Sequence, residues 1–259
     1  ETNIPPKWET AAAVDLHDRY FVTATASELE QLVQMLKQLR PLNCEAKHIT
    51  RIVEFCCDED SEIGIQATLI PNVEVLRCTL KDDVTTKQGM QRCIDYVREH
   101  PGTHVFASIP CTPWSPIQEL NIHLHGRSFE EYLKEEQDKS LKLMGKFITL
   151  PRIVRSLGGT MCFEWPKGST GWKEALTLRW IKEFLTKTVL LDGCFFELRS
   201  KRTGELIKKP WRFETDNWAI LKAFEDSTCI GGHKHQPCEG GETKKPQETT
   251  RRSWLGKLF

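Results

Sequence analysis

The sequence lacks any apolar run that could cross a lipid bilayer, which takes roughly 18 to 20 consecutive apolar residues. An apolar leader is also missing from residues 1–10. Net charge is absent too, since 36 basic side chains balance 36 acidic ones. We therefore expect no membrane span, and we expect any contact with nucleic acid to depend on a local basic patch.

The chain does have enough apolar residues to bury a core. Its 259 residues are 39% hydrophobic, which suits one large α/β domain or two small ones. Most of its ten cysteines lie in strand-like runs, whereas a disulfide framework is typical of small secreted proteins. We interpret the cysteines as reduced thiols in an intracellular protein.

Short apolar runs alternate with amphipathic segments from Arg51 onward, a pattern typical of a parallel sheet with helices on both faces. The expected strands are 52–56, 73–78, 105–109, 161–165 and 189–196. The expected helices are 27–40, 86–100, 128–157 and 172–187. Ligands bind such sheets beyond the carboxyl ends of the strands, so the candidate site residues are those that follow the strands.

Changes in composition divide the chain into four parts. An N-terminal arm covers residues 1–26, and the main domain covers 27–215, including the leading helix 27–40. A Cys/His-rich C-terminal element follows at 216–240, and a polar tail at 241–259. The candidate site residues fall in the second and third parts.

The strongest motif follows the expected strand 105–109 and reads Pro110-Cys111-Thr112-Pro113-Trp114-Ser115. It resembles the nucleophile loop of the DNA (cytosine-5) methyltransferases, which has the form Pro-Cys-x-x-aromatic-Ser. The resemblance implies that Cys111 is a covalent nucleophile, because a thiolate can add to carbon 6 of cytosine and later leave. The alternative is that Cys111 is a small buried hydrophobe in a proline-rich turn.

A second match ends the next expected strand, where Glu164-Trp165-Pro166 stands in the place of the family's Glu-Asn-Val. The resemblance implies that Glu164 hydrogen-bonds nitrogen 3 of a flipped cytosine and supplies a proton there. An apolar neighbour such as Trp165 would help to keep the pKa of this carboxyl raised. The alternative is that Glu164 caps a loop or pairs with a lysine such as Lys167.

The loop after the first expected strand matches the family's cofactor loop, Phe-x-Gly-x-Gly-Gly-x-x-x-Gly, in part. Phe55 and Gly64 keep the nine-residue separation, whereas Cys57, Glu59 and Asp60 replace the inner glycines. Acidic side chains suit the cationic cofactor S-adenosylmethionine. The resemblance implies cofactor contacts from Phe55, Cys56, Cys57, Asp58, Glu59, Asp60, Ser61, Gly64 and Pro110.

Two further matches are shorter. Asp83 lies in a segment that resembles the family's adenine-contacting Asp-Val, although a helix cap is the alternative. Arg199 and Arg202 occupy the place of the family's Gln-x-Arg, which implies that they hold the base and a phosphate, although they also suit a basic turn. A basic and aromatic patch able to contact a backbone and stack a base is formed nearby by Lys201, Arg202, Lys208, Lys209, Trp211 and Arg212.

Cysteines and histidines gather near the C-terminus. Cys229, His233, His235 and Cys238 offer four zinc ligands within ten residues, although a His-rich surface loop is the alternative. This Cys/His-rich end, the run from Glu54 to Gly64, and the segments 108–115 and 209–211 also resemble methyltransferase-like domains of retroelement polyproteins.

The family resemblance covers residues 51–202 and implies a Rossmann-like methyltransferase fold of the α/β class, with a mostly parallel sheet and helices on both faces. It implies an S-adenosylmethionine-dependent enzyme that acts on nucleic acid, with DNA favoured and RNA the alternative, and it favours the nucleus. Two alternatives stay open. One is a non-catalytic nucleic-acid-binding module that keeps the fold, and the other is a Rossmann-like enzyme with another substrate.

Overall fold

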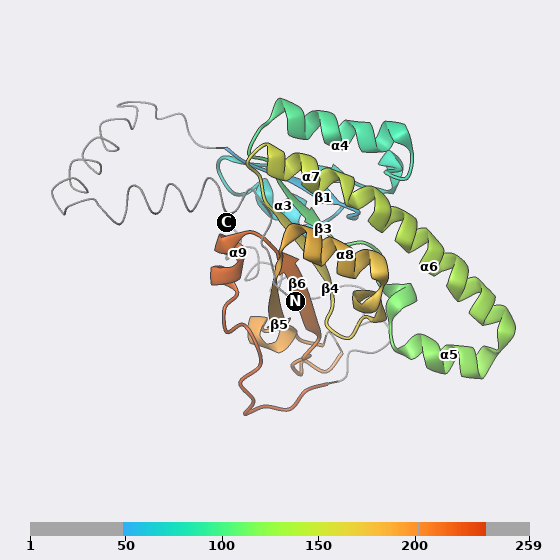
Figure 1. Cartoon of the computed structure of the whole chain (residues 1–259). Coiled ribbons are helices and arrows are strands. Elements are labelled where there is room, and N and C mark those ends of the chain that lie inside the picture. The colour runs from blue at the N-terminus through green and yellow to red at the C-terminus, as the bar shows by residue number, and fades with distance from the viewer. Residues whose placement is uncertain (1–48, 201, 237–259) are drawn as a thin grey trace, which may run out of the picture. The chain divides into compact units, whose positions relative to one another are not determined.

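The computed structural model describes residues 49–200 and 202–236. The expected arm 1–26, the leading helix 27–40 and the tail 241–259 lie outside these residues. At the centre of the described part is a six-stranded sheet with the order β2-β1-β3-β4-β6-β5 (Figure 1). Its strands are β1 Thr50–Phe55, β2 Val73–Cys78, β3 His104–Ala107, β4 Met161–Pro166, β5 Lys187–Asp192 and β6 Pro210–Thr215.

The sheet is mixed. Strands β1 to β4 pair in parallel, whereas β6 runs antiparallel to both β4 and β5. The reason is the connection: the described residues between Asp192 and Pro210 contain no α-helix, so the chain turns back and β6 pairs with β5 in the opposite direction. The expected α/β class is therefore confirmed, but two of the five strand pairings are antiparallel.

Seven α-helices flank the sheet in the described residues, labelled from α3 as in Figure 1. The expected helix 128–157 is divided at Ile148, and the expected strand 189–196 ends at Asp192 in a 3-10 helix, Gly193–Phe196. The sequence patterns missed α3, α5, α9 and β6. The helices are α3 Glu62–Ala67, α4 Lys87–Glu99, α5 Ile117–His125, α6 Arg127–Phe147, α7 Thr149–Ser156, α8 Ala175–Phe184 and α9 Trp218–Ala223.

Alternating side chains along the strands fill a core on each face of the sheet. In β3, Val105 and Ala107 pack with residues of α4, α6, α7 and α8, whereas Phe106 packs on the other face. There the Phe106 and Phe213 rings meet edge to face, 5.8 Å apart, and α3 and α9 complete the cover. The expected helices on both faces are present.

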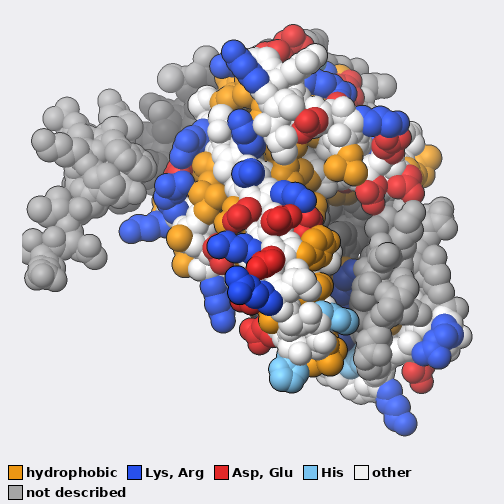
Figure 2. Space-filling view, turned by 90° about the vertical axis from the view of Figure 1, so that its right-hand side faces the viewer, with side chains coloured by type: hydrophobic (Ala, Val, Ile, Leu, Met, Phe, Trp, Pro, Cys, Tyr) orange, Lys and Arg blue, Asp and Glu red, His pale blue; other side chains and the backbone are white. Residues whose placement is uncertain are grey.

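The surface agrees with the balanced charge of the sequence. Figure 2 shows the side of the molecule that carries α5 and α6, where basic and acidic side chains are interspersed with hydrophobic ones. In the part of the chain that the structure describes, no helix is both long and apolar enough to span a membrane. The cysteines described there are all free thiols.

Candidate active site and metal cluster

Cys111 lies on the loop that follows β3, at the carboxyl-end edge of the parallel strands. The Ser108 amide donates to the Phe55 carbonyl over 3.2 Å, so this loop begins beside the end of β1. Pro110 is exposed and Cys111 is half-buried at the start of a 3-10 helix, Thr112–Trp114. The structure therefore places Cys111 in the position at which sheets of this kind bind ligands.

Hydrogen bonds with two elements, β4 and α6, fix the Cys111 loop. Indole Nε1 of Trp165 in β4 donates to the Ile109 carbonyl over 2.7 Å, and Nε1 of Trp114 donates to Ser140 Oγ of α6 over 2.8 Å. Gln137 Nε2, also from α6, donates to the Pro113 carbonyl over 3.1 Å. Because these groups are buried or half-buried, the bonds hold the backbone on both sides of the sulfur.

Glu164 lies near the carboxyl end of β4, next to the end of β3. Its neighbours Phe163 and Trp165 point into the core, so the alternation of the strand turns Glu164 to the opposite face. Ser108 Oγ donates to Glu164 Oε2 over 2.7 Å. The structure therefore brings Glu164 and the Cys111 loop together, as the order of the two motifs predicts.

Charges at this site act on both groups. Burial raises the pKa of the Cys111 thiol, and the nearby Glu164 carboxylate raises it further, whereas the Lys209 ammonium lowers it. Burial also raises the pKa of Glu164, against the Ser108 hydrogen bond and the charge of Lys209. Lys209 is thus the lysine that faces Glu164, where the sequence suggested Lys167. Cys111, Glu164, Ser108 and Lys209 are named the candidate active site.

Two members of this site were not assigned to it from the sequence. Ser108 is the first hydroxyl after β3, which is the only local signal that it carries. Lys209 was placed in a basic patch, because the turn that brings it to Cys111 depends on the unexpected strand β6.

The residues proposed for the cofactor lie around the loop between β1 and α3. Phe55 is fully buried in the core, its ring 5.4 Å from that of Phe147, while Cys56 packs against the same core with a left-handed φ of 60°. The Cys57 thiol donates to the Glu54 carbonyl over 3.4 Å. The loop thus turns sharply at Cys56, and its exposed side carries Asp58, Glu59 and Asp60.

Ser61 and Gly64 close the same loop from within. Ser61 Oγ accepts from the Gly64 amide over 3.1 Å and donates to the buried Glu54 carboxylate over 2.5 Å. Gly64 lies against the Arg77 side chain, whose Cδ would come within 2.5 Å of an added Cβ. Arg77 therefore covers Gly64. The exposed part of the loop is the acidic segment Asp58, Glu59 and Asp60.

The side chain of Asp83 accepts hydrogen bonds within the turn that follows β2. Its Oδ1 accepts from the Thr85 hydroxyl over 2.5 Å and from the Thr85 amide over 3.3 Å. The cap of α4 is instead Thr86, whose Oγ1 accepts from the Gly89 amide. The predicted adenine contact of Asp83 stays a prediction.

Arg199 and Arg202 lie on a small hairpin that follows the 3-10 helix 193–196. Arg199 pairs with Glu197 over 2.5 Å and donates to the Gly204 carbonyl, and Arg202 is exposed. Their predicted contacts with base and phosphate stay predictions.

The expected basic and aromatic patch is corrected in one respect. Trp211 is buried in β6 with 6% of its surface exposed, so it cannot stack a base. Arg212 pairs with the buried Glu214 and lies 4.4 Å over the Trp172 ring. Of the expected cations, Arg202 and Lys208 are exposed, and Lys201 lies outside the described residues.

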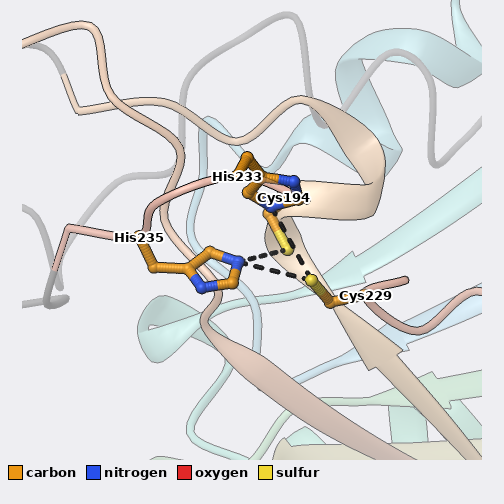
Figure 3. Close-up of side chains that lie close together, drawn as sticks. All are labelled: Cys194, Cys229, His233 and His235. Atoms are coloured by element: carbon orange, nitrogen blue, oxygen red, sulfur yellow. Dashed lines mark hydrogen bonds between the residues drawn. The ribbon is translucent and has the colours of Figure 1, made fainter. Parts of the chain in front are cut away.

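A cluster of four metal-binding side chains lies at the end of β5: Cys194, Cys229, His233 and His235, whose donor atoms are all within 4.8 Å of one another (Figure 3). Three of the four expected ligands are present, and the fourth, Cys238, lies outside the described residues. Buried Cys194, inside an expected strand, is the fourth member of the described cluster. Burial and the neighbouring Cys229 raise the pKa of the Cys194 thiol to about 12. This Cys/His cluster could hold a metal ion.

Comparison of the chain with protein-family models, with curated proteins and with solved structures found no match.

Proposed function

We propose that the chain is an S-adenosylmethionine-dependent cytosine-5 methyltransferase with the Rossmann-like methyltransferase fold, acting on nucleic acid, with DNA favoured over RNA. The observation that carries the proposal is the placement of Glu164 beside the Cys111 loop, held by Ser108 at 2.7 Å. Glu164 acts on the pKa of Cys111, and Lys209 lowers the pKa of both groups, so the two side chains of the proposed mechanism are linked electrostatically.

The roles of the side chains follow from their charges. Burial raises the pKa of Glu164 and so favours the protonated form, from which Glu164 donates its proton toward nitrogen 3 of a cytosine flipped into the site. That proton draws electrons from the ring, so carbon 6 accepts the sulfur of Cys111 and a Sγ–C6 bond forms. With Glu164 neutral, the charge that raises the Cys111 pKa is removed, and Lys209 favours the thiolate.

The addition places an electron pair at carbon 5, where S-adenosylmethionine would supply the methyl group. Loss of the proton from carbon 5 then returns electrons to the ring, the Sγ–C6 bond breaks, and Cys111 leaves as thiolate. The fixed backbone on both sides of the sulfur keeps Cys111 in place through addition and departure.

The loop between β1 and α3 fits this cofactor in charge. Asp58, Glu59 and Asp60 are exposed at the end of β1, the strand that borders the Cys111 loop. Carboxylates there would bind a sulfonium and an ammonium group and accept hydrogen bonds from ribose hydroxyls. For the Cys/His cluster, the proposed ion is zinc, because thiolates and imidazoles are the donors that zinc prefers.

Duplex DNA carrying 5-fluorocytosine tests the proposal, because fluorine at carbon 5 prevents the release of Cys111. With S-adenosylmethionine present, we expect a denaturation-resistant adduct at Cys111 in the wild type and no adduct in Cys111→Ser. The same probe in RNA decides between the two substrates. Failure of every nucleic-acid probe to form an adduct overturns the proposal.

A non-catalytic nucleic-acid-binding module is the second candidate. It is favoured by Arg77, which covers Gly64 where the resemblance implies a cofactor, and by the raised pKa of Cys111. Calorimetry separates the candidates: the enzyme binds S-adenosylmethionine and binds it less well as Asp60→Ala, whereas the binding module gives no heat with the cofactor.

A further inference from the structure

We infer that Cys194, Cys229, His233 and His235 form a closed structural zinc centre that fastens the segment 228–236 and the segment Leu206–Pro210 to the end of β5. The centre goes beyond methyl transfer, since its ligands and connections do not depend on that chemistry. Only its consequence for Lys209 rests on the proposed function.

The spacing of the donor atoms agrees with one tetrahedral ion. Zinc–sulfur bonds of about 2.3 Å and zinc–nitrogen bonds of about 2.0 Å put sulfur and nitrogen ligands about 3.5 Å apart around a tetrahedron. Nε2 of His235 lies 3.4 Å from Cys229 Sγ and 3.3 Å from Cys194 Sγ, and Nε2 of His233 lies 3.7 Å from Cys229 Sγ. The four side chains point toward a common centre in Figure 3.

The backbone around Cys229 supports a metal-bound thiolate. The Gly231 amide approaches Cys229 Sγ to 3.3 Å, which is the kind of contact that orients a ligand and spreads its charge. Gly231 and Gly232 both have left-handed φ angles, near 80°, so the chain can turn back between Cys229 and His233. Two thiolates and two imidazoles complete four-coordination, and a filled sphere is typical of structural zinc.

Packing alone gives the segment 228–236 little reason to hold this shape. Ile230 is 93% exposed, and the residues from Gly231 to Lys234 lie at the surface. Ordering such a segment costs backbone entropy that few buried side chains offset. A metal cross-link to the buried Cys194 supplies the missing stabilisation, as it does in small metal-dependent domains.

Each side of the centre is joined to the segment Leu206–Pro210. Gly193, next to Cys194, donates its amide to the Lys208 carbonyl over 2.6 Å and to the Lys209 carbonyl over 3.1 Å. Gln236, next to His235, donates its amide to the Leu206 carbonyl over 2.8 Å. Residues next to two of the ligands therefore hydrogen-bond to the segment Leu206–Pro210, which carries Lys209, and the ion would hold both of these connections in place.

Cys229 ties the centre to the strand itself. Its amide donates to Asp192 Oδ2 over 2.9 Å, and Asp192 is the last residue of β5. Lys208 Nζ lies 4.0 Å from the same carboxylate. Loss of the ion therefore loosens both the segment 228–236 and the approach of Lys209 to the candidate active site.

Zinc analysis of the purified full chain by mass spectrometry tests the ligand set. We expect one zinc per chain in the wild type and in Cys238→Ser, and a loss of at least tenfold in zinc affinity in Cys194→Ser and in His235→Ala. His235 is exposed, so its variant keeps the fold if Cys194→Ser does not. Full zinc binding by His235→Ala, or loss of zinc from Cys238→Ser, overturns this ligand set.

Hydrogen exchange of the wild type, with and without a chelator, tests whether zinc holds the segments 228–236 and Leu206–Pro210 at the end of β5. Removal of zinc is expected to speed exchange at least tenfold at the amides of Gly193, Cys229 and Gln236, and to leave those of β1 and β3 unchanged. Unchanged exchange at all three amides overturns the structural role. Neither experiment uses S-adenosylmethionine or nucleic acid, so a failed methyl transfer and a failed zinc centre are separate results.

Discussion

The hydroxyl of Ser108 donates to Oε2 of Glu164 over 2.7 Å and joins the carboxyl ends of β3 and β4 three residues before Cys111. The bond stabilises the charged form of a carboxyl that burial drives toward the neutral form. Burial outweighs this bond, so the pKa of Glu164 is raised, and the Glu164 carboxylate adds to the effect of burial in raising the pKa of Cys111.

Replacing Glu164 by Gln separates the effect of its charge on the Cys111 thiol from its role as a proton donor. Because the negative charge that raises the Cys111 pKa is removed, Cys111 is expected to react faster with iodoacetamide at neutral pH. Adduct formation with 5-fluorocytosine DNA is expected to slow by about 10²–10⁴-fold, since the proton donor is lost. Peptide-resolved mass spectrometry follows both reactions, and Glu119→Gln, exposed on α5, is the control that changes neither. Identical alkylation rates would show that the two groups do not interact.

The same substitution has a stability that depends on pH. The pKa of Glu164 is raised in the folded chain, so its contribution to stability is full below the unfolded value of 4.5 and is lost as the pH rises through the folded value. Glu164→Gln is therefore expected to be more stable than the wild type at neutral pH, with the difference shrinking toward pH 4.5 and below. Urea unfolding at several pH values measures the difference in unfolding free energy between the two proteins. A difference that grows as the pH falls would contradict a raised pKa for Glu164.

Lys209 and Lys208 offer a matched pair of substitutions. Lys209→Met removes a charge that lowers the pKa of both Cys111 and Glu164, so alkylation of Cys111 at neutral pH is expected to slow. Lys208→Met removes the adjacent charge, which faces Asp192, and should leave the rate unchanged. The pH profile of alkylation gives the pKa of the Cys111 thiol in each of the two variants. A shift in Lys208→Met as large as that in Lys209→Met would refute the placement.

Ser140 supports the Cys111 loop from α6. Ser140→Ala leaves the buried Nε1 of Trp114 without its acceptor, which is expected to cost about 1–3 kcal/mol of unfolding free energy. Ser156→Ala, at an exposed hydroxyl on α7, is the control with little effect. Urea denaturation compares the unfolding free energies of the two variants. Equal values would mean that the hydrogen bond from Trp114 to Ser140 does not stabilise the fold.

The alternation of strand-like and helical patterns was enough to predict most of the sheet. Strands β1 to β4 are short apolar runs, and such runs are long enough to recognise locally. β6 was missed although Trp211 and Phe213 alternate with Arg212 and Glu214, because the cations were interpreted as a binding patch. The half-buried strand that this pattern indicates explains why Trp211 packs inside.

The sequence by itself determined the α/β class, the place of Cys111 in a proline-rich loop after a strand, and the order in which Glu164 follows it, since these depend on local patterns and on chain order. Only the tertiary structure decided that Lys209 faces both groups and that Cys194 joins His235, from which it is separated by 41 residues. The physical reason is that both contacts form across the antiparallel return of β6 and the turns around it. Contacts between distant segments depend on which strands become neighbours, and a local pattern can indicate a strand such as β6 without showing which strands it pairs with.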